Sequence, residues 1–454
     1  MSQNQVTWAG CPCQNKAHGR DAHATTGSHL PITTRILSCG MPLVMEQMSG
    51  VRSVGLTWLL PAGSATDPAD RLGISTLWSE LLLRGAGDLN SRAQADAFDA
   101  LGVGRSADAA TLHMRFSFTL LGDRLLSALP LIMDMVRRPR LEDDAIDASR
   151  DLALQSLDSL KDDPQERAVL TLRERHNPSP LNRSGMGTVE GLESITRDDL
   201  LCAWEAHARP RGHGTSLGSI LGIAGDLDAA GGPDALASHV DALLATWTGN
   251  APALTPTPSA TRGTYLHLPD KSSQVQIVLM HDAPPEPSAD SKPERIVASV
   301  LSGGMAARLF TEVREKRALC YSVSESYSAD RDYGRVLAYV GTTPERAQES
   351  LDVLMAELRR INTSAGRITP EEFQRAMVGI RSGLIFAGES TGGRAASLVG
   401  DMHRLGRPRT LEEIAAQYAA LTIEQANAYL ARRDLGAVTI VTLGPGELRP
   451  PTTA

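Results

Sequence analysis

The chain repeats itself, and that repeat constrains its fold more than any single motif does. The segment ALPLIMDMVRR at 128–138 aligns with SLDVLMAELRR at 350–360, and the apolar pattern of 141–157 then aligns with that of 368–384. The copies lie too far apart for a small repeat unit, and each has enough chain for a hydrophobic core of its own. The sequence therefore predicts two homologous halves.

A Pro- and Thr-rich stretch separates the two halves. Residues 246–263 have no apolar periodicity and are typical of an interdomain linker. We therefore predict an N-terminal domain over 31–245, a C-terminal domain over 264–450 and a mobile hinge near Gly249–Ser259. Residues 1–30 are polar and aperiodic, which predicts a flexible N-terminal tail.

The tail contains thiols and imidazoles, the ligands that zinc prefers. They are Cys11, Cys13, His18, His23 and His29. Their spacing matches no established zinc finger, and a flexible tail would have to become ordered in order to bind. We therefore expect no functional metal there.

Charge and length exclude several classes of protein. The 45 Lys and Arg residues against 53 Asp and Glu give a net charge of −8 with no basic block, which argues against nucleic acid as a partner. No apolar run approaches the roughly 20 residues that span a bilayer, and the N-terminus lacks the apolar core of a secretory signal. Five irregularly placed cysteines favour a reducing cytoplasm over a disulfide framework.

Local periodicity predicts a mixture of strands and helices, and hence an α+β fold. Strands are predicted over 33–48 (reversing at Gly40), 51–60, 110–121, 216–228, 264–269 and 272–282. Helices are predicted after Gly73, from an N-cap at Ser91 to Gly102, over 125–138 and 143–161, after an N-cap at Thr196, and over Pro293–Ser302.

The most informative stretch is Leu301–Tyr327. Helical spacing of apolar residues over Ala306–Lys316 changes to strand-like alternation over Leu319–Tyr327. The glycine pair at its start, Gly303-Gly304, lacks the Lys-Ser/Thr that completes a phosphate-binding P-loop. A Cys nucleophile at Cys320 is also not favoured, because that residue lies in the predicted strand.

Three blocks of this stretch resemble the C-terminal half of the M16 peptidases, the family of insulinase and the mitochondrial processing peptidase. The blocks are Arg308-Leu309-Phe310, Val313-Arg314-Glu315-Lys316 and Leu319-Cys320-Tyr321-Ser322-Val323. The resemblance extends over nearly the whole chain and implies two M16-type domains, each a mainly antiparallel sheet packed with helices. In that family an Arg and a Tyr seven residues apart face the zinc site of the N-terminal half, and here they are Arg314 and Tyr321.

The zinc site that the resemblance implies is degenerate in this sequence. The family's frame is present as Gly63-Ser64, Asp67-Pro68, Gly73, Leu81-Leu82 and Arg84-Gly85. The family's His-x-x-Glu-His positions, however, hold Thr76, Ser79 and Glu80, and its third ligand falls near Gln155-Ser156. A neutral hydroxyl is a poor zinc ligand, and a lone carboxylate cannot hold the ion. We therefore expect no metal bound by this chain, and no peptidase activity from it alone.

The resemblance implies a role beside another chain, because some M16 enzymes divide their parts between two subunits. The expected partner is a catalytic M16 homologue that carries the zinc, in a heterodimer or heterotetramer, and the expected ligand is a peptide or unfolded polypeptide. Tyr321 would donate to the oxyanion of the reaction and Arg314 to substrate carbonyls. The alternatives are a structural, peptide-binding subunit like the core proteins of the cytochrome bc complex, and a free-standing peptide-binding clamp.

Overall fold

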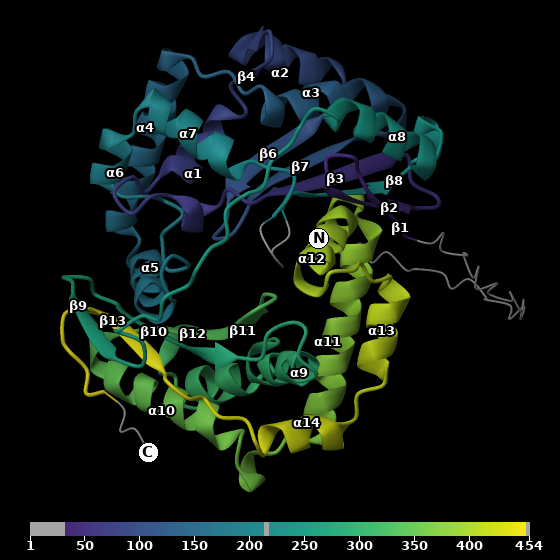
Figure 1. Cartoon of the computed structure of the whole chain (residues 1–454). Coiled ribbons are helices and arrows are strands. Elements are labelled where there is room, and N and C mark those ends of the chain that lie inside the picture. Colours follow the sequence, from purple (N-terminus) through teal and green to yellow (C-terminus); the bar gives the residue numbers. More distant parts are fainter. Residues whose placement is uncertain (1–31, 213–217, 451–454) are drawn as a thin grey trace, which may run out of the picture.

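The computed structural model describes residues 32–212 and 218–450. Figure 1 shows them as two halves that face each other, each built on one sheet with helices on its outer side. The cysteines and histidines of the tail, with the tail itself, lie outside the described residues. No helix among the described residues is long and apolar enough to cross a membrane.

The N-terminal sheet has the strand order β1-β2-β8-β3-β7-β6. Neighbouring strands run antiparallel except for β2 and β8, which run parallel. The strands are β1 (Thr33–Ile36), β2 (Pro42–Gln47), β3 (Ser53–Leu60), β6 (Gly104–Ala109), β7 (Met114–Leu121) and β8 (Ile220–Gly225), and a small separate ribbon is formed by β4 (Gly85–Ala86) and β5 (Leu89–Asn90).

The C-terminal sheet repeats this topology in the order β11-β12-β10-β13-β9. Its strands are β9 (Tyr265–Pro269), β10 (Val275–Ala283), β11 (Cys320–Ala329), β12 (Gly334–Thr342) and β13 (Thr439–Gly444). The parallel pair β13–β9 corresponds to β8–β2, and every other neighbouring pair is antiparallel in both sheets. The predicted α+β fold with two homologous domains is therefore confirmed.

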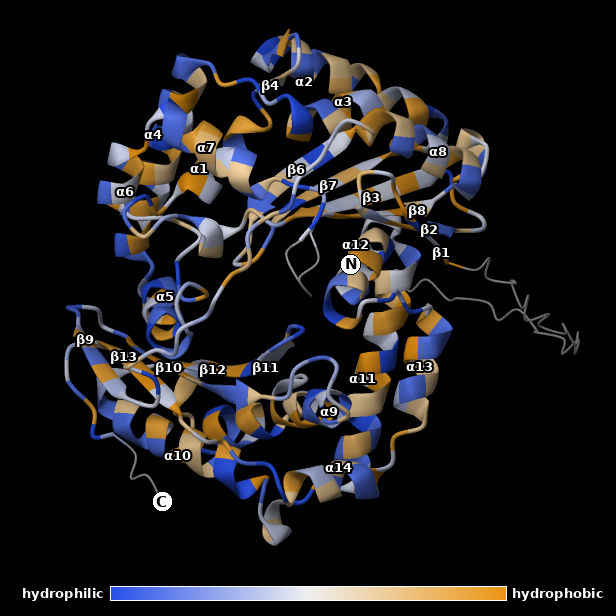
Figure 2. Ribbon diagram, viewed as in Figure 1, coloured by the Kyte–Doolittle hydropathy of each residue, from blue (hydrophilic) through white to orange (hydrophobic). Residues whose placement is uncertain are grey.

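Most of the helices cover the outer faces of the two sheets, and two of them lie between the halves. In the N-terminal half they are α1 (Ile74–Leu81), α2 (Ser91–Ala100), α3 (Leu125–Arg137), α4 (Asp143–Ser159), α5 (Pro164–His176), α6 (Val189–Ser194), α7 (Arg197–His207) and α8 (Pro233–Leu244). In the C-terminal half they are α9 (Ser291–Ser302), the short π-helix η5 (Phe310–Glu315), α10 (Ala347–Arg360), α11 (Pro370–Glu389), α12 (Thr391–Leu405), α13 (Leu411–Ala419) and α14 (Ile423–Leu430). Figure 2 shows hydrophobic residues running through the central strands that these helices cover.

Several sequence predictions need correction. Asn90, not Ser91, caps α2, because its side chain accepts from the amide of Ala93. The missed elements include α5, α6, α8, α12, α13, α14, β12 and β13. Strand β6 was missed as well, and its sequence GRSADA is rich in residues that disfavour strands. The predicted strand over 110–121 begins only at Met114, because the residues before it form the turn between β6 and β7.

The two halves exchange a helix. Helix α5, which belongs to the N-terminal half in sequence, packs its Ala168, Val169 and Leu172 against the C-terminal sheet. Helix α12 of the C-terminal half packs in the same way against β3 and β8 of the N-terminal sheet, through the apolar residues Ala395, Leu398, Val399 and Met402. Each sheet therefore depends on the other half of the chain for part of its cover.

Glycines on the N-terminal sheet make this close packing possible. A Cβ at Gly55 would lie 2.4 Å from the backbone of Thr391 and Gly392, and one at Gly222 would lie 2.6 Å from the side chain of Val399. Beside them, the buried guanidinium of Arg394 forms an ion pair with the buried carboxylate of Glu46. The contact between α12 and the sheet thus has both an apolar part and a charged part.

The predicted linker is attached to the N-terminal half. Two backbone hydrogen bonds join Ser179 and Thr257, at 2.9 and 2.6 Å, and the amide of Ala251 donates to Arg211. Trp247 is buried in the N-terminal core. The domain limits and the mobility of the hinge stay predictions.

Candidate functional site

Helix α1 carries the positions at which the family pattern places the zinc ligands. Its start is fixed by Asp67, whose carboxylate accepts hydrogen bonds from the amides of Gly73 and Ser75 at 2.9 and 3.0 Å and from the Ser75 hydroxyl at 3.0 Å. Burial raises the pKa of Asp67 to about 6 in spite of these bonds. Leu77 and Trp78 anchor the opposite face of the helix in the core.

The side chains at those positions do not fit a zinc ion. The Thr76 hydroxyl donates to the carbonyl of Gly185, and the Ser79 hydroxyl donates to the carbonyl of Thr76 at 2.7 Å. The Glu80 carboxylate lies 3.8 Å from the guanidinium of Arg84. Zinc needs three or four imidazole, thiolate or carboxylate ligands directed at one point, and two hydroxyls bonded to backbone carbonyls do not supply them.

Helix α4 supplies no replacement for the missing ligands. Gln155 and Ser156 are exposed, and the Ser156 hydroxyl donates to the carbonyl of Leu152 at 2.9 Å. Within the residues that the structure describes, no group of three or more His, Cys, Asp and Glu side chains is placed to hold a metal. The absence of bound zinc from the protein itself stays a prediction.

Arg314 and Tyr321 lie on either side of the junction of η5 and β11. The chain turns between them at Ala318, which has a φ of 50°. Leu319 anchors this turn: its side chain is buried, its amide donates to Val313 at 3.0 Å, and its carbonyl accepts from the Ser350 hydroxyl at 3.3 Å. The backbone that joins the Arg and the Tyr is therefore tied to the core.

Both side chains are presented to solvent. Arg314 lies over the ring of Phe310, with 4.8 Å from its guanidinium carbon to the ring centre. Tyr321 is 61% exposed and occupies a β-bulge, since the pairing of β11 with β12 shifts between Cys320 and Ser322. A bulge turns a side chain away from the regular alternation, and here it directs the phenol outward. Figure 1 places β11 and α1 in opposite halves of the molecule.

Arg308, the Arg of the first family-like block, makes structural contacts, whereas Arg314 and Tyr321 are exposed. The Arg308 guanidinium donates to the Glu372 carboxylate at 2.6 and 2.7 Å, and to the carbonyls of Gly366 and Arg367 at 2.6 and 2.9 Å. A buried guanidinium with its donors satisfied in this way joins η5 to the start of α11. It has no donor directed at the exposed Arg314 and Tyr321.

The structure also brings together histidines that are far apart in the sequence. The rings of His113, after β6, and His403, on α12, are 4.4 Å apart, and His403 lies 2.8 Å from Asp330 in the turn between β11 and β12. Burial lowers the pKa of His113 to about 3. Burial alone would raise the pKa of Asp330, but the hydrogen bond and charge of His403 lower it to about 2. No local motif in the sequence predicted this cluster.

A buried carboxyl follows Tyr321 on the same strand. Glu325 is 6% exposed, and neither of its oxygens has a hydrogen-bond partner among the described residues. Nearby, the Glu294 carboxylate accepts from Arg433 at 2.8 Å and from Tyr429 at 2.6 Å. Burial, and then the charge of Glu294, raise the pKa of Glu325 to about 8. The sequence held a signal for this, since Glu325 interrupts an inward-facing series of Val323 and Tyr327.

Two known protein-family profiles match the chain. A family profile described as insulinase (peptidase family M16) matches residues 43–188, and one described as the peptidase M16 inactive domain matches residues 194–378. Together they cover well over half of the chain. The chain belongs to the M16 peptidase family.

Curated relatives of this M16 chain are called uncharacterized zinc proteases. One from Mycobacterium leprae is 26% identical, over 86% of this chain and 86% of its own length. One from Streptomyces coelicolor is 24% identical, over 98% and 96%. The zinc in those names belongs to those proteins, whereas the residues of this M16 chain that we expect at the ligand positions are Thr76, Ser79 and Glu80.

Solved structures share the M16 fold. The crystal structure of a peptidase M16 inactive domain from Pseudomonas fluorescens superposes with a TM-score of 0.80 at 21% identity, covering 93% of this chain and all of that one. A protease from Helicobacter pylori superposes with a TM-score of 0.78 at 15% identity, covering 91% and 99%. At these identities the likeness concerns the fold alone.

Proposed function

We propose that this chain is a zinc-free M16 subunit that pairs with a catalytic, zinc-bearing homologue in a peptide-processing or peptide-degrading cage. The observation that carries the proposal is the asymmetry between the halves. Helix α1 offers hydroxyls engaged with backbone carbonyls, whereas η5 and β11 present Arg314 and Tyr321 exposed, on either side of a hydrogen-bonded turn.

The chemistry of these two residues suits substrate binding and stabilisation of developing charge. A phenol such as that of Tyr321 donates one hydrogen bond to an oxyanion formed when water attacks a peptide carbonyl. The Arg314 guanidinium keeps its charge and offers fixed donors to substrate carbonyls. In the proposed complex the partner's zinc activates the water, and this chain supplies the donors.

The partnership is tested by mixing the two chains. The mixture should cleave peptides far faster than either chain alone, and Tyr321→Phe should lower that rate by about 10²–10³-fold, the usual effect of losing one oxyanion donor. Tyr265→Phe, on the far edge of the same sheet, is the matched control. Arg314→Ala should also weaken peptide binding, while its neighbour Arg317→Ala should not.

An active mixture whose rate is unchanged by Tyr321→Phe would refute the donated site. The structural, peptide-binding reading would then replace it. We further propose a cytoplasmic location, which is consistent with the free thiols of Cys39, Cys202 and Cys320.

A further inference from the structure

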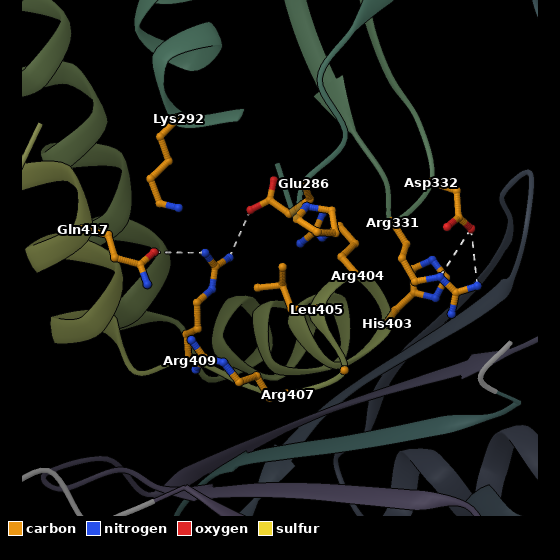
Figure 3. Close-up of a pocket in the computed structure, with 12 residues that line it drawn as sticks. Glu286, Lys292, Arg331, Asp332, His403, Arg404, Leu405, Arg407, Arg409 and Gln417 are labelled. Atoms are coloured by element: carbon orange, nitrogen blue, oxygen red, sulfur yellow. Dashed lines mark hydrogen bonds and ion pairs between the residues drawn. The ribbon is translucent and has the colours of Figure 1, made fainter. Parts of the chain in front are cut away.

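A cationic pocket lies where α9, α12 and α13 meet, away from Arg314 and Tyr321. Its volume is about 600 Å³. The lining comes from the loop after β10, the first turn of α9, the β11–β12 turn, the end of α12 with the loop after it, and α13. Figure 3 shows Lys292, Gln417 and Arg409 extending into it from three different elements.

The lining carries more positive than negative charge. Its cations are Lys292, Arg331, Arg404, Arg407 and Arg409, and its carboxylates are Glu286 and Asp332. Both carboxylates are already paired. Glu286 is 2.5 Å from Arg295 and 3.2 Å from Arg409, and Asp332 is 3.3 Å from Arg331.

Two of the cations have no direct carboxylate contact of their own. Among the described residues, Lys292 and Arg404 interact with Glu286 only through its charge, and that carboxylate is already paired with Arg295 and Arg409. The Arg404 Nε is buried without an acceptor. The Nδ1 atom of His403, the preceding residue of α12, is likewise buried and unpartnered. A buried donor without an acceptor costs free energy, so the pocket has unused capacity to bind an anion.

The Arg404 guanidinium lies beside its own helix. It approaches Gly400, one turn earlier on α12, where a Cβ would come within 2.7 Å of a guanidinium nitrogen. The pKa of Lys292 is lowered, first by burial and then by the positive charge of Arg409. Positive charge therefore gathers in this pocket.

We propose that this pocket binds the carboxylates of an acidic polypeptide segment, with Lys292 and Arg404 as the direct ligands. The inference rests on the proposed function and names the class of peptide that the subunit favours. A polypeptide suits the pocket better than a free ion does, since the cavity is far larger than one carboxylate or phosphate. Pro287 and Leu405 add apolar surface beside the cations.

The test uses the full-length protein and two labelled peptides of equal length, one Glu-rich and one Gln-rich, in fluorescence anisotropy titrations. At low salt the Glu-rich peptide should bind about tenfold or more tightly, since charge-assisted hydrogen bonds exceed neutral ones. The difference should shrink as salt rises. The double variant Lys292→Gln/Arg404→Gln should lose the preference and keep its affinity for the Gln-rich peptide. Lys161→Gln, an exposed cation in the other half, is the control.

Each other outcome overturns the inference in a distinct way. Equal affinity for the two peptides, or a preference that survives in the double variant, overturns the carboxylate site and leaves the proposed function standing. Inorganic phosphate that binds as tightly as the Glu-rich peptide makes this a site for free oxyanions. If neither peptide binds, the proposed peptide-binding function fails together with the inference.

Discussion

The buried carboxyl of Glu325 gives a prediction with a calculable magnitude. Burial and the charge of Glu294 raise its pKa from 4.5 to about 8. The folded state thus retains a proton that the unfolded state releases, so the contribution of Glu325 to the free energy of unfolding is highest below pH 4.5 and falls as pH rises toward 8. At 1.36 kcal/mol per pH unit, the loss is about 3 kcal/mol at pH 7 and about 5 kcal/mol above pH 8.

Replacing Glu325 by Gln removes this dependence while keeping the shape of the side chain. The assay is urea unfolding of wild type and Glu325→Gln between pH 4.5 and 9, with the difference in free energy of unfolding plotted against pH. Between pH 4.5 and 7, the free energy of unfolding of the variant should rise by about 3 kcal/mol relative to that of wild type. If the Gln amide lacks a hydrogen-bond partner, the difference in free energy of unfolding shifts by the same amount at every pH. The prediction therefore concerns only the slope of this difference against pH.

The difference plot separates Glu325 from the other titrating groups. Burial lowers the pKa values of His113 and His176 to about 3 and about 4, which makes stability rise with pH up to about 6.5 in both proteins. Those terms cancel in the difference. Asp332→Asn, an exposed carboxyl, is the control. A difference that stays flat from pH 4.5 to 8 would mean that Glu325 is ionised in the folded protein, and would refute the reasoning.

Three further outcomes are expected. Elemental analysis after dialysis should find no stoichiometric zinc; about one zinc per chain that persists after removal of residues 1–30 would contradict the degenerate site. Limited proteolysis should cut first near Gly249–Ser259. Because the halves exchange α5 and α12, the two fragments should still co-elute in size-exclusion chromatography, and fragments that separate would show that the exchanged helices bind weakly. Gly55→Ala should lower the free energy of unfolding by about 1–3 kcal/mol, the usual effect of overpacking, because the new methyl would meet the backbone of α12. Gly379→Ala in α11, which has open space around it and no positive φ, is the control, and a loss at Gly55 no larger than at Gly379 would argue against the close contact.

Much of the fold followed from local patterns. The repeat between the helices at 128–138 and 350–360 predicted two homologous halves, and the structure gives both halves the same sheet topology. Period-2 and period-3.6 spacing located most strands and helices. The exceptions, such as α5 and β6, have weak local signals, and their structure depends on the neighbours against which they pack.

The sequence alone also predicted that the candidate site lacks zinc ligands. Ligand chemistry depends on the identity of a side chain, so Thr76, Ser79 and Glu80 argued against zinc before any geometry was known. In the same way, Arg314 and Tyr321 were found from their spacing within the family-like blocks. Their presentation on a hydrogen-bonded turn and a β-bulge was not, because a bulge depends on pairing with β12.

Only the tertiary structure decided how the two halves are held together and where positive charge gathers. The exchange of α5 and α12, the contact of His113 with His403 and the pocket cations Lys292 and Arg404 all join segments far apart in the chain. Local periodicity reports that a face is buried, but it does not report what covers that face. A charge is paired or unpaired only once the chain has brought its neighbours to within a few ångströms, and the pairing of neighbours in space is set by the packing of whole elements.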